Sequence, residues 1–374
     1  MSLLIDKHEK FFNRCLIALP SKLQSEDSNK LGLIYFCLHG LGLINRFKFS
    51  PPELEFYREF IYDSYLISND EFQGFRATEY FARTNPEYDL PSVSATFFAL
   101  VNLLILESDY SKRLDRHLVM NFVKRCQFTL GPNKGSFAPT LRYNEDTKQY
   151  EPYGETDLRI CYVAIGIRKL LKYDESSQTN DINTTTATDF ILDRLNHAGG
   201  FSSDKYTETH VGFTFCALAS LKLLGYDLSQ SKFGRTLDWL IHRQVDYTDN
   251  HDMTYDYYQV EDRGSYNGRD NKLGDTCYSW WCTGSIKLLG QSKLELTNLP
   301  MARDYLLKTT QNELLGGFAK DHEAPPDPFH TFMAVASLSL WNSLLPDNFQ
   351  LQEIVEELVI TKPLEQFLQA MEFS

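Results

Sequence analysis

Three residues in the second half of the chain carry side chains that bind metal ions: Asp275, Cys277 and His330. Asp275 and Cys277 stand two positions apart, and His330 follows 53 residues after the cysteine. A carboxylate, a thiolate and an imidazole together suit zinc, and three protein ligands leave a fourth coordination position open, as in catalytic sites. An Asp-x-Cys pair is a weak signal by itself, because Cys277 could be a buried core thiol and Asp275 a helix N-cap.

A second group of residues offers positive charge and hydrogen-bond donors. Its members are His210, Arg269, Lys272, Tyr278 and Lys320. Cations that meet at helix N-termini bind diphosphate groups well, although any single lysine or arginine is more often a solvated surface charge. The segment around Arg269 and Lys272 lacks the Gly-x-x-x-x-Gly-Lys-Ser/Thr pattern of a Walker loop, so nucleotide hydrolysis is unsupported.

An internal repeat must position these side chains. A glycine, an aromatic residue, a polar loop and an apolar helix follow one another five times, with the aromatics at positions 75, 137, 201, 266 and 318. The intervals between them are 62, 64, 65 and 52 residues, and each is long enough for two helices. We expect the helices after the aromatics at 95–106, 161–171, 213–224, 278–289 and 330–341, and a surface loop at 174–188.

This repeat predicts an all-α fold. Stacked helical hairpins form either an open solenoid or a closed α/α toroid, and aromatic residues at the helix starts favour closure around a cavity. Although 374 residues could form two or three domains, we expect one toroid domain over residues 1–374. Aromatic residues make up 14% of the chain, which favours a large apolar cavity, although an aromatic-rich core is the simpler interpretation.

Alignment of the repeats brings the reactive side chains to equivalent positions. His210, Asp275 and Asp327 each lie nine residues after the aromatic of their repeat, and His330 lies twelve after its own. Equivalent positions of a cyclic repeat share one rim, so His330 is expected near the Asp275-x-Cys277 pair. A zinc site that activates a thiol, a diphosphate site and an apolar cavity together predict the alkylation of a thiol by an isoprenoid diphosphate.

Composition and charge exclude several classes of protein. Lys and Arg number 37 against 50 Asp and Glu, a net charge of −13, which argues against a general nucleic-acid-binding protein. Seven cysteines form no even framework, so we expect free thiols and a cytoplasmic protein. The first residues do not resemble a signal peptide, and no run of 18 apolar residues predicts a transmembrane segment.

The segment 264–281, with sequence GSYNGRDNKLGDTCYSWW, resembles the zinc and diphosphate signature of protein prenyltransferase β subunits. The Gly-Gly-Phe repeats and Asp327-Pro-Phe-His330 are similar to that family as well. The resemblance implies an α/α toroid, a heterodimer with a helical-repeat α subunit, and one Zn²⁺ on Asp275, Cys277 and His330. It implies that His210, Arg269, Lys272 and Tyr278 hold the diphosphate. It also implies a lipid and peptide cavity lined by Gly32, Phe36, Glu155, Arg159, Tyr162, Trp281 and Phe329.

Two positions indicate which member of the family the chain resembles most. Farnesyltransferases and the Rab-type enzyme resemble each other in an acidic residue at the position of Lys320, where farnesyltransferase uses it to help hold Mg²⁺. A lysine there is similar to type I geranylgeranyltransferases and implies that Mg²⁺ is not required. Gly32 stands where a large aromatic shortens the farnesyl pocket, so it leaves room for the C20 chain of geranylgeranyl diphosphate. By resemblance, the acceptors are C-terminal CaaX peptides of Rho-family small GTPases.

Other interpretations remain open at this point. Phe329 and the pair Trp280-Trp281 are similar to the Rab-type enzyme, and a farnesyltransferase is a further alternative within the family. A terpene cyclase shares the toroid, but the chain has neither Asp-x-Asp-Asp nor Asp-Asp-x-x-Asp. A helical scaffold without chemistry is the simplest alternative, and a protein without bound zinc would favour it.

Overall fold

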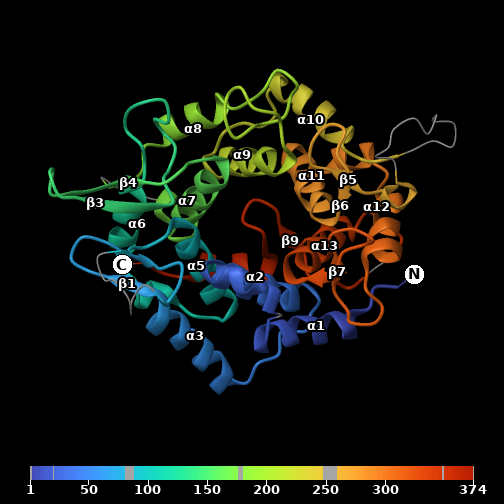
Figure 1. Cartoon of the computed structure of the whole chain (residues 1–374), viewed down its shortest axis with the longest axis horizontal. Coiled ribbons are helices and arrows are strands. Elements are labelled where there is room, and N and C mark those ends of the chain that lie inside the picture. Colours follow the sequence, from blue (N-terminus) through green and yellow to red (C-terminus); the bar gives the residue numbers. More distant parts are fainter. Residues whose placement is uncertain are drawn as a thin grey trace.

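Six helices form a closed inner ring within the part of the chain that the computed structural model describes, which is residues 2–19, 21–80, 88–175, 180–246, 259–347 and 349–373 (Figure 1). Each helix of the ring packs against the next, and α13 packs back against α2. The α/α toroid expected from the repeat is therefore confirmed. The inner helices are α2 (Lys30–Leu43), α5 (Val93–Ile105), α7 (Leu158–Leu170), α9 (Val211–Leu223), α11 (Thr276–Leu289) and α13 (Pro328–Trp341).

An outer layer of helices surrounds this ring (Figure 1). The two layers differ in sequence, because an inner helix is buried on nearly every side and an outer one on a single face. In α9 every residue from Thr214 to Leu221 is buried, whereas α10 buries only Thr236, Trp239 and Leu240. The remaining helices are α1 (Ile5–Ile17), α3 (Pro51–Tyr65), α6 (Arg116–Arg125), α8 (Thr184–Leu192), α10 (Gly234–Ile241), α12 (Leu299–Asp304) and α14 (Lys362–Ala370).

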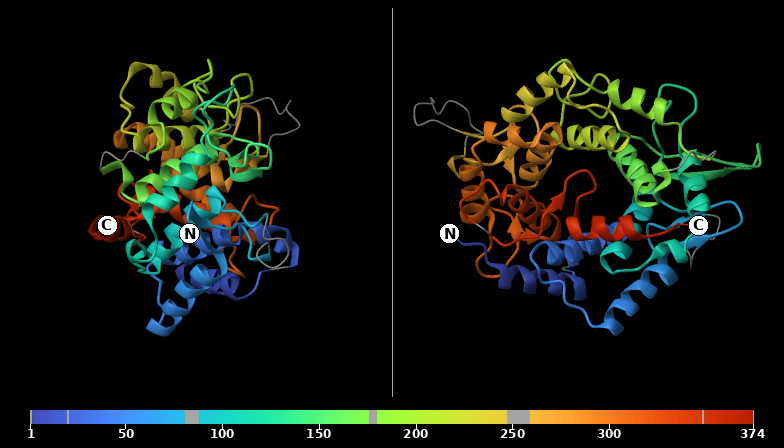
Figure 2. Two further views of the ribbon diagram at one scale, coloured as in Figure 1. Left: turned by 90° about the vertical axis from the view of Figure 1, so that its left-hand side faces the viewer. Right: turned by 180° about the vertical axis from the view of Figure 1, so that it is seen from behind.

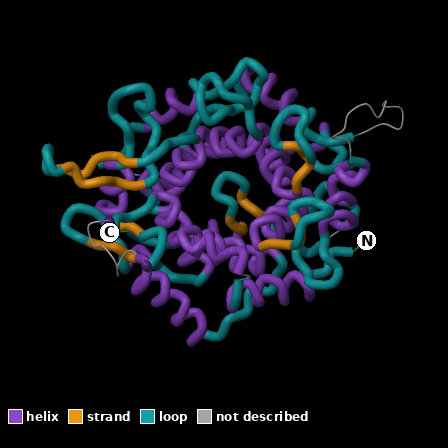
Figure 3. Tube along the Cα trace, in the orientation of Figure 1, coloured by secondary structure: helices purple, strands orange, loops and turns teal. Residues whose placement is uncertain are grey.

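Short antiparallel strand pairs lie in the segments between successive helices (Figure 3). In β5–β6 the repeat aromatic Tyr266 lies opposite Asp275, and in β7–β8 Phe318 lies opposite Asp327. The hairpin therefore returns the chain to the aromatic after nine residues, which explains the constant spacing in the sequence. The pairs are β1 (Leu66–Ser68) with β2 (Gln73–Phe75), β3 (Thr140–Asn144) with β4 (Gln149–Tyr153), β5 (Tyr266–Asn267) with β6 (Gly274–Asp275), β7 (Phe318–Ala319) with β8 (Pro326–Asp327), and β9 (Ile354–Val355) with β10 (Ile360–Thr361).

The repeat aromatics anchor these hairpins in the core. All five are fully buried: Phe75, Phe137, Phe201, Tyr266 and Phe318. In three repeats the backbone N–H of the aromatic donates to a threonine hydroxyl of the following inner helix at 2.9 Å. Since inner and outer helices alternate along the chain, the inner helices run in one direction and their N-termini share one end of the ring.

The expected loop at 174–188 is wrong in its last five residues. Helix α8 begins at Thr184, and the Asn183 side chain caps it by accepting the N–H of Thr186 at 3.0 Å. Threonines have low helix propensity, which hides this helix in the sequence, but burial of Ala187, Phe190 and Ile191 on one face stabilises it. Residues 176–179 of the expected loop lie outside the described residues.

The N-terminal helix completes the outer layer where the ring closes, since α1 packs on both α2 and α13. Its buried His8 lies between Gln311 and Gly317, more than 300 residues away in the sequence. The Nδ1 atom of His8 accepts the N–H of Gly317 at 2.9 Å, so Nε2 carries the proton and donates to Gln311 Oε1 at 2.9 Å. The ring of His8 also stacks on Phe318, with centroids 4.8 Å apart.

We expect this closure to make the protein sensitive to mild acid. Burial lowers the pKa of His8 to about 4, although the hydrogen bond to Gln311 opposes the shift. In the unfolded chain His8 therefore binds a proton near pH 6.5, whereas in the folded protein it binds one only near pH 4. The free energy of unfolding falls as pH drops from 6.5 towards 4. From pH 7.5 to pH 5 the loss from His8 is about 2 kcal/mol.

Urea unfolding at both pH values measures this effect. A His8→Gln variant cannot titrate at this position, so its stability should fall by less than that of the unchanged protein over the same interval. Equal pH slopes in the two proteins would contradict the assignment.

The C-terminal segment covers the end of the ring opposite the inner-helix N-termini. Helix α14 lies on the side of the ring seen from behind in Figure 2. Between β9 and β10, Glu356 pairs with Lys222 at 2.8 Å and with Lys287 at 3.4 Å, and these lysines lie in the last turns of α9 and α11. The Tyr35 hydroxyl donates to the carbonyl of Val359 at 2.6 Å, which ties this segment to α2.

Candidate active site

Five inner helices begin with a side chain that caps their N-terminus. The capping atom accepts a backbone N–H of the first turn in each case, as expected for an N-cap. Two of these capping residues, His210 and Asp275, are also candidate site residues. Each accepts a backbone N–H at the start of its helix, and both lie at the same rim of the ring. The caps are Ser92, Asp157, His210, Asp275 and Asp327.

The structure brings Asp275, Cys277 and His330 together, although they come from two different repeats. One ligand atom from each lies within 4.8 Å of the other two, and His330 Nε2 is 3.3 Å from Asp275 Oδ1. Ligand atoms around a tetrahedral zinc ion stand about 3.3–3.8 Å apart, so a small inward shift of the side chains suffices. The donor set and its geometry fit zinc with one open position.

A carboxylate that the sequence argument did not assign to the metal site orients His330. Asp327 Oδ2 lies 2.5 Å from His330 Nδ1, and Asp327 Oδ1 accepts the backbone N–H of His330. Nδ1 therefore donates to the carboxylate, and Nε2 is left to face Asp275. A metal-binding histidine commonly has such a carboxylate partner, and the Asp-x-x-His spacing at a helix start was the available signal in the sequence.

Burial and charged neighbours both shift the pKa values of the three residues. Burial raises the pKa of the Cys277 thiol well above its usual range, and the nearby Asp275 raises it further. Burial lowers the pKa of His330, but the carboxylates of Asp275 and Asp327 outweigh it and raise the pKa to about 9. Burial also opposes ionisation of Asp275, yet His330 holds the pKa of this carboxyl below its usual value.

A cavity of about 180 Å³ meets the trio at Asp275, whereas Cys277 and His330 do not line it. Arg269, Lys272, Tyr278 and Lys320 all line it, together with Asp275. The sequence argument missed the acidic residues of the same lining, which are Asp262, Asp321 and Glu323. The cavity is therefore a mixed site with cations at its wall, and it is not uniformly positive.

His210 does not line this cavity, but it lies beside Tyr278, which does. Burial and, to a smaller extent, the nearby Arg269 and Arg159 lower the pKa of His210 to about 4, so its imidazole adds no positive charge near neutral pH. Its Nδ1 accepts the N–H of Gly212 at 3.0 Å, which leaves the proton on Nε2. Nε2 lies 3.3 Å from the hydroxyl of Tyr278, and these two groups can donate to one anion.

The cations differ in their surroundings. Arg269 pairs with Glu208 at 3.2 Å, and both side chains are more than two-fifths exposed. Lys320 is 54% exposed, and its Nζ lies 3.8 Å from Asp321 Oδ2. The backbone carbonyl of Lys320 accepts the N–H of Thr276 at 2.9 Å, which fixes the lysine beside the start of α11.

Gly32 and Phe36 lie one turn apart on α2, beside aromatic residues of other inner helices. Phe36 contacts Phe329 with ring centroids 5.2 Å apart and Phe98 at 6.3 Å. A Cβ atom on Gly32 would meet the Phe98 ring at 3.4 Å, so a methyl group fits but a large side chain would have to displace Phe98. Phe98 could not be predicted as a site residue, because nothing in the sequence distinguishes it from the many other aromatic residues.

The other predicted cavity residues lie on α7 and α11 or just before them. Tyr162 is buried with its ring 5.9 Å from Phe215, which is 5.1 Å from Trp281. Arg159 pairs with Asp157 at 2.6 Å, and Glu155 is exposed. Arg159 and Glu155 thus remain at the rim, whereas Tyr162 and Trp281 belong to the aromatic contacts inside it.

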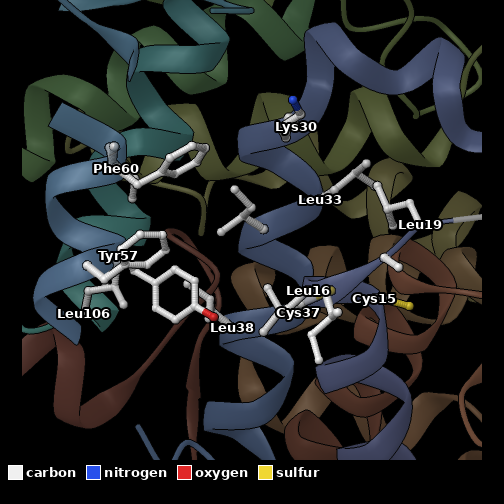
Figure 4. A pocket seen from close by; sticks show the side chains of 15 residues that line it. Cys15, Leu16, Leu19, Lys30, Leu33, Cys37, Leu38, Tyr57, Phe60 and Leu106 are labelled. Atoms are coloured by element: carbon white, nitrogen blue, oxygen red, sulfur yellow. The ribbon is translucent and has the colours of Figure 1, made fainter. Parts of the chain in front are cut away.

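A larger apolar groove, of about 360 Å³, lies elsewhere (Figure 4). It is formed by α1, α2 and α3, and Leu33 and Cys37 of α2 line it. Gly32 and Phe36, which directly precede Leu33 and Cys37 in the sequence, do not line the groove. They lie beside the aromatic residues described above. The groove therefore lies on another face of α2 from the predicted site residues. None of the described helices is long and apolar enough to cross a membrane.

Comparisons with known proteins agree on one family. Residues 3–364 match the model of the prenyltransferase alpha-alpha toroid domain. The chain is 28% identical to geranylgeranyl transferase type-1 subunit beta of Dictyostelium discoideum, with 90% of each covered, and 27% identical to its Arabidopsis thaliana counterpart, with 90% of this chain and 84% of that one covered. Among solved structures, Candida albicans protein geranylgeranyltransferase-I complexed with GGPP is 54% identical, with a TM-score of 0.94 over 99% of each chain.

Proposed function

Because the chain belongs to the prenyltransferase alpha-alpha toroid family, we propose that it is the catalytic β subunit of a type I protein geranylgeranyltransferase. It moves the C20 group of geranylgeranyl diphosphate (GGPP) to a cysteine thiol of an acceptor protein. The observation that carries this proposal is the trio of Asp275, Cys277 and His330 beside a cavity whose wall includes Lys320. The similarity to the Candida albicans enzyme complexed with GGPP supports it.

Asp275, Cys277 and His330 would hold zinc, and the hydrogen bond from His330 Nδ1 to Asp327 would keep Nε2 directed at the metal. Zn²⁺ at this site would lower the pKa of the incoming cysteine thiol and supply it as a thiolate. The sulfur then forms a bond to C1 of the isoprenoid while the bond from C1 to the diphosphate oxygen breaks, and the electron pair leaves with the diphosphate.

The residues of the adjoining cavity stabilise that leaving group. Arg269, Lys272 and Lys320 supply positive charge, and Tyr278 and neutral His210 supply hydrogen-bond donors. The ammonium of Lys320 supplies the positive charge that a magnesium ion would otherwise supply. Unlike a magnesium ion, it needs no carboxylate ligands to hold it. We infer from this that Mg²⁺ is not required.

The proposal extends to the partners of the chain. The curated relatives are named as beta subunits, so an α subunit completes the enzyme. CaaX peptides ending in leucine, as in Rho-family GTPases, are the acceptors, and the cytoplasm is the compartment. Residues 1–374 act as one toroid domain. The aromatic residues around Gly32 and Phe36, with Tyr162, Trp281 and Phe329, surround the lipid, and Glu155 and Arg159 lie where the peptide enters.

A transfer assay tests the proposed function. The chain is co-expressed with its α subunit and given radiolabelled GGPP and a peptide ending in Cys-aliphatic-aliphatic-Leu, in buffer without Mg²⁺. We expect label on the peptide and one zinc per heterodimer by elemental analysis. Strict dependence on Mg²⁺ would contradict the type I assignment, and a protein without stoichiometric zinc would favour a scaffold.

Phe329 and Trp280-Trp281 favour the Rab-type enzyme as a second candidate, and a farnesyltransferase is the third. Competition between farnesyl and geranylgeranyl diphosphates at equal concentration separates the farnesyl enzyme from the others. Transfer to a CaaX peptide separates the type I enzyme from the Rab-type enzyme.

Gly32 provides a prediction on lipid length. A Gly32→Tyr variant should favour farnesyl over geranylgeranyl diphosphate by at least about tenfold relative to the unchanged enzyme, because the ring and the displaced Phe98 fill the space of the last isoprene unit. Gly32→Ala is the matched control, since its methyl group fits beside Phe98 and alanine is favourable in a helix. A Gly32→Tyr enzyme with unchanged preference would show that α2 does not limit chain length.

A further inference from the structure

The loop between β5 and β6, residues 268–273, carries two of the cations proposed to bind diphosphate, Arg269 and Lys272. We call it the diphosphate loop. Three of its contacts hold it at its two ends. Gly268 packs so closely under the ring of Tyr278 that a Cβ atom would lie 2.2 Å from it, Asn267 pairs with Gly274, and the Gly274 N–H donates to Asp262 at 3.0 Å.

A further contact reaches the middle of the loop from the outer layer. Arg243 follows α10, its side chain is 8% exposed, and its Nη1 forms an ion pair with Asp270. Its guanidinium packs over the Trp239 ring, with Cζ 5.0 Å from the centroid, and its Nε donates to the carbonyl of Trp239 at 3.2 Å. The backbone carbonyl of Arg243 accepts the N–H of Asn267 at 2.9 Å.

The energetics of this pair favour a fixed loop. A buried guanidinium that loses its carboxylate partner is strongly destabilised, so Arg243 holds Asp270 in place. The side chain of Asp270 is 47% exposed and stands between Arg269 and Lys272 in the sequence. The ion pair therefore restrains the backbone that carries both cations, and it also neutralises a carboxylate that would otherwise repel a bound anion.

The preceding repeat provides an internal comparison. Arg194 and Arg243 both stand one position before the residue that bridges to the repeat aromatic, Leu195 to Phe201 and Gln244 to Tyr266. Arg194 is also buried and packs over a ring, that of Phe190. Its ion pair, however, is with the neighbouring Asp193. Of these two equivalent arginines, Arg243 is the one that forms an ion pair with a loop at the rim. That loop is the diphosphate loop, which carries Arg269 and Lys272.

We propose that Arg243 is a positioning residue for diphosphate binding, and that its ion pair with Asp270 fixes the diphosphate loop so that Arg269 and Lys272 meet the leaving group together. This inference rests on the proposed function. It predicts a change in anion affinity opposite in direction to the change that charge alone predicts. Asp270→Asn removes a negative charge beside an anion site, so an electrostatic role predicts tighter anion binding, whereas a positioning role predicts weaker binding.

Inhibition by inorganic pyrophosphate in the α–β heterodimer is the direct test. We expect Asp270→Asn and Arg243→Met each to raise the pyrophosphate inhibition constant and the KM for GGPP about tenfold, a change within the range of coupling energies between contacting residues. The KM for the acceptor peptide and the zinc content should stay within twofold of the unchanged enzyme. The double variant should be no worse than Arg243→Met, and Arg243→Lys should recover part of the loss.

Arg168→Met is the matched control, because the Arg168 side chain is also largely buried, at 13% exposed, and pairs with Asp181 at 2.7 Å near the C-terminal end of α7. It should lower the melting temperature without changing pyrophosphate inhibition. Asp270→Asn that binds pyrophosphate as tightly as the unchanged enzyme, or more tightly, overturns the inference even if Arg243→Met fails to fold. If Arg269→Ala and Lys272→Ala also leave inhibition unchanged, the proposed diphosphate site itself is wrong.

Discussion

Replacing Cys277 with alanine should remove the bound zinc and reduce prenyl transfer on the order of a thousandfold, since a metal ion contributes several kcal/mol to such a reaction. The loss follows from the ligand count. Asp275 and His330 remain as two donors after the substitution, one too few to hold zinc tightly with a position left for the acceptor thiol. Elemental analysis of the purified heterodimer and transfer of labelled GGPP to a CaaX peptide measure the two effects.

Cys282→Ala is the control for this experiment. Cys282 lies on the same helix, five residues further on, and it is also fully buried. Its thiol donates to the carbonyl of Leu240 at 3.2 Å, away from the metal-binding trio. The control should lose some thermal stability because a small cavity is created, but it should retain zinc and turnover. Full activity in Cys277→Ala would show that this thiol belongs to the core and has no part in the reaction.

The proximity of Asp275, Cys277 and His330 could be predicted from the sequence, because equivalent residues follow the repeat aromatics at a constant spacing. The hairpin returns the chain to the buried aromatic after nine residues, so Asp275 and Asp327 occupy equivalent N-caps. His330 then lies one turn into α13, beside the neighbouring helix α11 that carries Cys277. Local chain geometry, repeated around a ring, is what allows two residues 53 positions apart to be predicted as neighbours.

Other features could not be predicted because they depend on contacts between distant segments. The hydrogen bonds of His8 to Gln311 and Gly317 join the N-terminal helix to the segment before α13 and follow no repeat. The neutral state of His210 depends on how deeply the folded ring buries it, which residue type alone does not show. Phe98 is one of many aromatic residues until its ring is seen beside Gly32.

The acidic residues of the cavity lining were missed for a related reason. Asp262 lies before the signature segment and Asp321 and Glu323 follow Lys320, so none of them stands at a repeat-equivalent cap. Their presence matters for the chemistry, because a cavity that already contains carboxylates needs few changes to accept a divalent cation. Under the proposed function, we therefore expect the ammonium of Lys320 to be the feature that makes this site independent of magnesium.

Lys320→Asp should consequently convert the enzyme to magnesium dependence. The substitution removes an ammonium from the cavity wall and places a carboxylate next to Asp321, so turnover in Mg²⁺-free buffer should fall about a hundredfold. Two adjacent carboxylates and the diphosphate oxygens then supply the oxygen ligands that Mg²⁺ prefers, and millimolar Mg²⁺ should restore at least about a tenfold part of the loss. The unchanged enzyme should respond little to Mg²⁺ over the same range.

Lys308→Asp is the matched charge reversal, because Lys308 is also 54% exposed but lies after α12, where it pairs with Asp304 at 2.9 Å. It changes the net charge of the chain by the same amount as Lys320→Asp, so it separates a local effect from a general one. Turnover of this control should stay within about twofold of the unchanged enzyme with or without Mg²⁺. A Lys320→Asp enzyme that is impaired but indifferent to Mg²⁺ would contradict the proposed role of the ammonium, because a lysine that only substitutes for the metal charge must become replaceable by the metal.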